Sequence, residues 1–176
     1  MKKFILKYGL IVGLINASGL VSIIFATSHT NFDYGEVIGY TLMLAAFSMA
    51  YLGVKKYRDE ALSGSISFGN ALLTGLLITL LASTIYVLTW LIVFYNFVPN
   101  FMENYADACF DRMKQKGMGD ADIAEKMNEI SKIKELYKSP IFVILITYSE
   151  VLPVGILASL VSSIVLRKKI KPAQEA

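Results

Sequence analysis

The chain has 176 residues, of which 55% are hydrophobic and only 18% are charged, with a net charge of +3. A soluble domain typically carries about 25% charged residues, so the composition argues against an ordinary water-soluble protein. The basic residues stand at the ends of long apolar runs rather than on a face interleaved with aromatic residues, which argues against a nucleic-acid partner.

Four apolar runs are long enough to cross a lipid bilayer as helices, since about 20 residues span its hydrocarbon core of roughly 30 Å. In chain order they cover residues 4–26, 37–54, 68–98 and 141–166. At about 1.5 Å per residue the third run would be ~46 Å long, so it must tilt or project from the membrane. We therefore expect four membrane spans in a single membrane domain over residues 1–176.

Clusters of lysine and arginine stand on every second connection, and this bias orients membrane proteins. The clusters occur in residues 1–7, in the connection 55–67 and after Leu166, whereas the connection 27–36 contains no lysine or arginine. The long segment 99–139 is close to neutral instead, with seven basic and eight acidic residues. The positive-inside rule therefore predicts that both termini and the connection 55–67 are cytoplasmic. It places the connection 27–36 and the long segment 99–139 outside.

The first run has a second interpretation as a cleaved signal peptide. Basic residues precede its apolar stretch, and Ala26 ends an acceptable cleavage site. The length of the run and its interruptions at Gly9, Gly13 and Asn16 favour a retained span instead. We interpret it as the first of the four spans, with cleavage as the alternative.

Each span carries small residues about four positions apart, and such stripes let helix backbones approach closely within lipid. The sequence therefore predicts an all-α, integral membrane four-helix bundle. The same stripes would also suit a homo-oligomer. The packing positions that we single out are Gly9, Gly13, Gly75, Gly155 and Ser159.

The segment 99–139 predicts an extracytoplasmic helical hairpin between spans three and four. Pro99 should stop the third span, because proline lacks an N–H and clashes with the preceding turn. Glycines at 117 and 119 interrupt a helical pattern, and Asp120 is a candidate N-cap for the next helix. The hairpin is either a cap that binds a partner or a solvated connector whose apolar stripe rests on lipid or on the span ends.

Glu150 is the one acidic or basic side chain well inside a predicted span. Counted from Leu166 at about 1.5 Å per residue, it lies ~24 Å from the cytoplasmic edge and near the outer surface of the hydrocarbon core. Pro153 should kink this span and leave the carbonyl of Ser149 without its helical donor. Polar neighbours at similar or slightly greater depth complete a candidate intramembrane polar site: Thr84, Asn16, Tyr40 and Thr41.

An intramembrane carboxylate is by default a functional hypothesis, and a glutamate near a freed carbonyl could bind a proton or a cation. The structural alternative is that Glu150 reaches headgroups or water, or donates one hydrogen bond as a neutral acid. A single cysteine, Cys109, and a single histidine, His29, cannot build a His/Cys metal site within one chain. We therefore expect no cofactor and no metal.

Several short motifs recur in a characteristic order: Lys-Tyr-Gly-Leu-Ile-Val-Gly at 7–13, Gly-Ser-Ile-Ser-Phe-Gly-Asn-Ala at 64–71, and the stretch 95–104 before an outer segment with Lys-Gly-Met-Gly-Asp-Ala-Asp. Pro153-x-Gly155 and a final Arg167-Lys-Lys follow. In this order and spacing the chain resembles the four-span bacterial membrane proteins catalogued as domain of unknown function 4199. The resemblance implies a bacterial inner-membrane location and supplies no activity or catalytic residues.

No Gly-x-Ser-x-Gly, His-Glu-x-x-His or Walker-type motif occurs in the sequence, so we expect no enzyme activity. The first functional hypothesis is a non-enzymatic envelope accessory or scaffold protein. The alternative is a small proton- or cation-coupled transporter or channel that uses Glu150. The expected partners are the lipid bilayer and either a second copy of the chain or another envelope protein.

Overall fold

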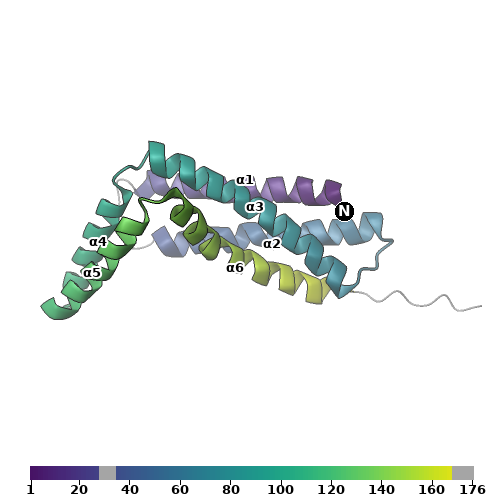
Figure 1. Ribbon diagram of the computed structural model, residues 1–176. Helices are drawn as coiled ribbons and strands as arrows, with labels where there is room; N and C mark the ends of the chain where they lie inside the picture. Colours follow the sequence, from purple (N-terminus) through teal and green to yellow (C-terminus); the bar gives the residue numbers. More distant parts are fainter. Residues whose placement is uncertain (28–34, 168–176) are drawn as a thin grey trace, which may run out of the picture.

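The computed structural model describes residues 1–27 and 35–167, and within these ranges the chain forms six helices. They are α1 (Lys2–Thr27), α2 (Gly35–Ala61), α3 (Phe68–Asn96), α4 (Phe101–Gln115), α5 (Asp120–Leu136) and α6 (Pro140–Leu166). The helices α1, α2, α3 and α6 alternate in direction and lie side by side, while α4 and α5 form a hairpin at one end (Figure 1). All four are long and apolar enough to cross a membrane. The predicted all-α bundle with a helical hairpin between spans three and four is confirmed.

The second span is longer than the sequence pattern predicted. We expected the connection 55–67 to begin at Lys55, but α2 continues as a helix to Ala61. Lysine, arginine and glutamate favour helix, and Lys56 pairs with Glu60 one turn later at 3.2 Å. Gly64, whose φ of +82° suits glycine, then donates its amide to the carbonyl of Arg58 and ends the helix.

The N-terminus, the end of α2 and the end of α6 meet at the same end of the bundle, opposite the hairpin (Figure 1). The rings of Phe4 and Tyr57 lie 5.7 Å apart, and the Arg58 guanidinium donates to the carbonyl of Leu166 at 3.4 Å. This arrangement brings together the basic residues in the first two turns of α1, at the end of α2 and at Arg167. We call it the basic end and the opposite one the hairpin end. The remaining tail lysines and most of the 27–36 connection, at 28–34, lie outside the described residues.

Helices α3 and α6 pack closely through small residues near the middle of the bundle. A methyl group at Gly75 would lie 2.9 Å from Cβ of Ser159, so the two backbones leave no room for a side chain there. The Thr79 hydroxyl lies 3.1 Å from the carbonyl oxygen of Gly155 and donates to it. Within lipid the hydrophobic effect does not drive helices together, so they associate through close backbone packing and interhelical hydrogen bonds of this kind.

Helix α1 is also part of the bundle core. A methyl group at Gly9 would meet Leu81 at 2.6 Å, and one at Gly13 would meet Ile85 at 2.6 Å, both on α3. Val12, between these two glycines, is fully buried. Helix α1 therefore fills one side of the bundle, and its cleavage as a signal peptide stays an untested alternative.

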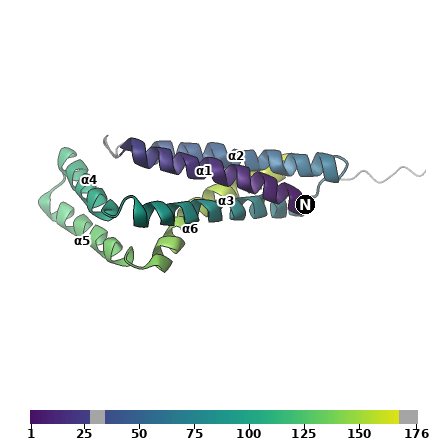
Figure 2. The ribbon, with the colours of Figure 1, turned by 90° about the horizontal axis from the view of Figure 1, so that it is seen from above.

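The hairpin of α4 and α5 extends obliquely from the bundle (Figure 2). Gly117, at a φ of +68°, lies between its two helices. The N-cap of α5 is Gly119, not the predicted Asp120, which is instead the first helical residue and places its charge at the positive end of the helix. Glu103 of α4 and Lys134 of α5 form an ion pair of 2.8 Å across the hairpin.

This ion pair predicts that acid loosens the hairpin. The Lys134 ammonium holds the pKa of the Glu103 carboxyl below its ordinary value. The pair therefore stabilises the hairpin above the unfolded pKa of about 4.3, and this stabilisation is lost as the pH falls through the lowered folded value. Hydrogen exchange of the hairpin amides, corrected for intrinsic rates, should be faster at pH 3 than at pH 6. Lys134→Met should remove most of that difference, whereas the exposed neighbour Lys132→Met should keep it; equal behaviour of the two variants would contradict the assignment.

Candidate functional site

A chamber of about 500 Å³ lies at the hairpin end, between the four long helices and the hairpin. Rings from α3 and from the hairpin close part of it: Trp90 lies 5.0 Å from Phe101, and Phe94 lies 5.7 Å from Tyr137. We call this space the hairpin-end chamber. Its aromatic lining comprises Tyr40, Tyr86, Trp90, Phe101, Tyr105 and Tyr137.

Two polar groups of different character face this chamber. Asn16 of α1 is only 5% exposed, and its Nδ2 atom has no hydrogen-bond partner among the described residues. Glu150 of α6 also lines the chamber, but its side chain is exposed rather than enclosed. Among the described residues of the lining, Glu150 is the one carboxylate, and none is lysine, arginine or histidine.

The structure brings together three of the five residues of the predicted polar site. Asn16, Tyr40 and Glu150 line the same chamber. Thr84 lies outside the lining, where its hydroxyl bonds to the Leu80 carbonyl and to the Tyr148 hydroxyl.

The other two predicted features of this region also lie away from the chamber lining. Thr41 is exposed on α2 and donates to the carbonyl of Val37 at 2.7 Å. Pro153 stays inside a continuous α6, one turn beyond Glu150. Whether a residue lines the chamber therefore depends on which way its side chain faces as well as on its depth.

Sequence reasoning missed most of the aromatic lining and Thr147. The missed residues do carry a signal, because Tyr86 and Trp90 are one helical turn apart on α3, and Thr147 and Glu150 are three residues apart on α6. Such spacing places both members of each pair on the same face. A search for polar and aromatic residues sharing a face would have found Tyr86, Trp90 and Thr147.

Tyr137, which precedes α6, provides a half-buried hydroxyl on the hairpin side of the chamber. Burial, together with smaller electrostatic effects of Glu150 and Tyr105, raises the pKa of this hydroxyl to about 12. Desolvation disfavours the phenolate, so Tyr137 remains a neutral donor throughout the physiological range. The chamber thus combines one carboxylate with neutral aromatic walls.

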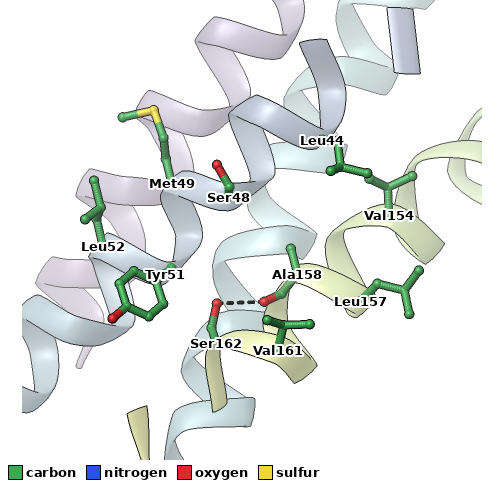
Figure 3. Close-up of a pocket in the computed structure, with 10 residues that line it drawn as sticks. All are labelled: Leu44, Ser48, Met49, Tyr51, Leu52, Val154, Leu157, Ala158, Val161 and Ser162. Carbon is green, nitrogen blue, oxygen red and sulfur yellow. Dashed lines mark hydrogen bonds between the residues drawn. The ribbon is translucent and has the colours of Figure 1, made fainter. Parts of the chain in front are cut away.

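A second hollow runs between α2 and α6, nearer the basic end, and has a volume of about 610 Å³ (Figure 3). Its walls are mostly aliphatic, and no acidic or basic residue lines it in the described part of the chain. The hydroxyls of Ser48 and Ser162 donate to carbonyls of their own helices at 2.6 Å. This groove therefore offers an apolar surface suited to lipid chains, without the polar groups of the chamber.

The middle of the bundle is filled beneath the chamber. Met43 belongs to the chamber wall, and the residues that follow it on the same face of α2, Phe47, Ala50 and Val54, are fully buried. Ile78 of α3 packs in the same core. The chamber is consequently closed toward the basic end.

A direct comparison with known families gives the same family that the order and spacing of the motifs indicated. The model of the family described as protein of unknown function DUF4199 matches residues 7–168, nearly the whole chain. The chain belongs to the DUF4199 family. No curated protein and no solved structure matches it.

This DUF4199 protein is an integral membrane protein by its four apolar helices. Within the described residues, no group of three His, Cys, Asp or Glu side chains is placed to hold a metal ion. What the chamber offers chemically is binding: one carboxylate, one buried amide and several aromatic faces around a space of about 500 Å³. Ligand pockets commonly occupy about 300–1,000 Å³, so the volume suits a small molecule or a lipid headgroup.

Proposed function

We propose that this protein is a non-enzymatic accessory protein of the bacterial inner membrane that binds a ligand in the hairpin-end chamber. Both termini would be cytoplasmic, which places the chamber in the outer half of the membrane. The observation that carries the proposal is the convergence of Asn16, Tyr40 and Glu150 on one hollow of the bundle. The gathering of basic residues at the opposite end supports the orientation.

A transporter or channel centred on Glu150 is the second candidate. Its support is the single carboxylate of the chamber wall, which is exposed and lies three residues before Pro153. Against it stands the packed core of Phe47 and Ile78, which closes the chamber toward the basic end. A hollow closed at that end favours binding over passage through a single copy of the chain.

Filling the chamber should abolish ligand retention. Gly39 lines the chamber, and a methyl group there would meet Ile23 at an ordinary 3.7 Å, so Gly39→Leu extends into the space without crowding the backbone. The full chain, purified in mild detergent from its own membranes, should carry a stoichiometric small molecule or lipid that mass spectrometry identifies. Gly39→Leu should lose most of it.

The matched control is Gly69→Leu, because Gly69 is exposed near the start of α3 and nothing lies within 4 Å of its added side-chain position. Equal ligand content in both variants would overturn the proposal. Proton or cation flux through liposomes that disappears in Glu150→Gln would favour the transporter instead. A stoichiometric envelope protein in the same purification would identify the partner that an accessory role requires.

A further inference from the structure

The walls of the hairpin-end chamber have the composition of a site for an organic cation. Six aromatic rings contribute to the lining, and Glu150 contributes its carboxylate. The faces of Tyr and Trp rings attract ammonium groups, and a carboxylate on the same wall adds to that attraction. An anionic ligand would meet no basic side chain among the described lining residues.

The buried amide of Asn16 adds a second requirement on the ligand. Its Nδ2 atom is a donor without a partner among the described residues, on a side chain that is 5% exposed. Buried polar groups are nearly always hydrogen-bonded, so an unsatisfied donor in a chamber wall points to an acceptor on the ligand. Thr147 lines the same chamber, but its hydroxyl donates to the carbonyl of Val143 at 2.7 Å and makes no hydrogen bond with Nδ2 of Asn16.

The rest of the lining is aliphatic, with Leu20, Ile23, Leu42 and Ile146 among it. An inorganic cation usually takes several carboxylate or other oxygen ligands, and Glu150 is the one carboxylate among the described lining residues. A ligand with an ammonium group and a hydrocarbon body would instead satisfy the rings, the carboxylate and the aliphatic wall together.

We propose that the hairpin-end chamber binds an amphiphilic organic ammonium compound that carries a hydrogen-bond-accepting oxygen near its nitrogen. Glu150 and the rings of Tyr86 and Trp90 hold the ammonium group, Asn16 donates to the oxygen, and the aliphatic wall takes the hydrocarbon. The ethanolamine phosphate headgroup of a membrane phospholipid has this chemistry, and so does a free amphiphilic amine that bears a hydroxyl or ether oxygen near its nitrogen. This inference rests on the proposed binding function and adds the class of the ligand.

Trp90 is the only tryptophan of the chain and lines the chamber, so its fluorescence reports occupancy directly. The full chain in a neutral detergent is titrated with four probes: hexylamine, dihexanoyl phosphatidylethanolamine, hexanol and dihexanoyl phosphatidylglycerol. Hexylamine and hexanol share the same apolar part, and so do the two dihexanoyl phospholipids. In each pair one compound carries an ammonium group and the other does not. We expect a saturable change of Trp90 emission with the two ammonium compounds and none with the other two.

Two variants test the assigned roles. Glu150→Gln should weaken binding of both ammonium compounds by about tenfold or more, since it removes the charge and keeps the shape. Glu60→Gln, the same change on an exposed residue at the basic end, should leave it unchanged. Asn16→Leu should weaken binding of the phospholipid several-fold and leave hexylamine unchanged, because hexylamine has no acceptor oxygen.

The outcomes distinguish the ammonium assignment from the proposed binding function, and a lipid headgroup from a free amine as the ligand. Saturation by the phospholipid alone supports a lipid headgroup, and saturation by hexylamine as well supports a free amine. Saturation by hexanol or phosphatidylglycerol at equal affinity, or an unchanged affinity in Glu150→Gln, would overturn the ammonium assignment and leave a chamber that binds something else. If none of the four probes changes Trp90 emission saturably, the ammonium assignment fails; the proposed binding function fails as well only if Gly39→Leu and Gly69→Leu retain equal amounts of co-purified ligand.

Discussion

Gly155→Ala is expected to lower the stability of the bundle by about 1–3 kcal/mol, the usual cost of overfilling a packed interior. A methyl group at this position would lie 2.9 Å from Cε1 of Phe47 and closer still to Cγ2 of Thr79. Phe47 is fully buried and Thr79 is 1% exposed, so neither side chain has room to move away. The helices α3 and α6 would have to separate, and the hydroxyl bond from Thr79 to the Gly155 carbonyl would lengthen.

The partner substitution gives a sharp check on this explanation. Thr79→Ser removes the methyl group nearest to the added carbon and keeps the hydroxyl, so Gly155→Ala combined with Thr79→Ser should recover part of the loss. Gly69→Ala is the matched control, since nothing lies within 4 Å of that position. Denaturation in mild detergent with increasing sodium dodecyl sulfate, followed by circular dichroism, measures all four proteins. Equal stability of Gly155→Ala and Gly69→Ala would mean that α3 and α6 are not held together at this contact.

The spans and the hairpin could be predicted because each leaves a signal in a short stretch of sequence. Long apolar runs fix the membrane helices, and the glycines at 117 and 119 fix the break between α4 and α5. The end of α2 could not be placed in this way. Charged residues at Lys55, Lys56 and Arg58 mark where the chain leaves lipid, but a helix can continue past that boundary when its residues favour helix.

The chamber was harder to predict, because depth along a span does not say which way a residue faces. Thr84 and Glu150 were placed at similar depth, and indeed Thr84 bonds to Tyr148, two residues before Glu150 on α6. Yet each residue turns a helix by about 100°, so Tyr86 lines the chamber while Thr84, two positions earlier, does not. Rotation about the helix axis is set by packing partners on other helices, and those partners are distant in sequence.

The hairpin contributes to the chamber through residues that have no distinctive local pattern. Phe101 and Tyr105 of α4, together with Tyr137 after α5, read in sequence as the apolar stripe of two surface helices. Only the ring contacts between Trp90 and Phe101 and between Phe94 and Tyr137 show that this stripe faces the chamber rather than lipid. Segment 99–139 was interpreted either as a cap that binds a partner or as a connector whose apolar stripe rests on lipid or on the span ends. The residues by which the segment contacts the span end are also the residues by which it lines the chamber.

Trp90→Ala is expected to detach the hairpin from the bundle and to cost about 3 kcal/mol, as removal of a large buried ring usually does. Trp90 is 7% exposed, and its ring lies 5.6 Å from Phe94 and 5.0 Å from Phe101, so it joins the end of α3 to the start of α4. Without it Phe101 keeps only its ring contacts with Phe94 and Tyr105, and water enters the chamber. Trypsin should then cleave the hairpin at Lys126 and Lys132 much faster than in the unaltered chain.

Phe97→Ala is the matched control, because Phe97 lies at the same end of α3 but is 59% exposed. Its removal should change the cleavage rate little, although its ring lies 6.3 Å from Phe25. If Trp90→Ala and Phe97→Ala leave the hairpin equally resistant, the hairpin is held by contacts other than the rings around Trp90. In that case the hairpin would still cover the chamber without Trp90, and its order would depend on the ion pair between Glu103 and Lys134.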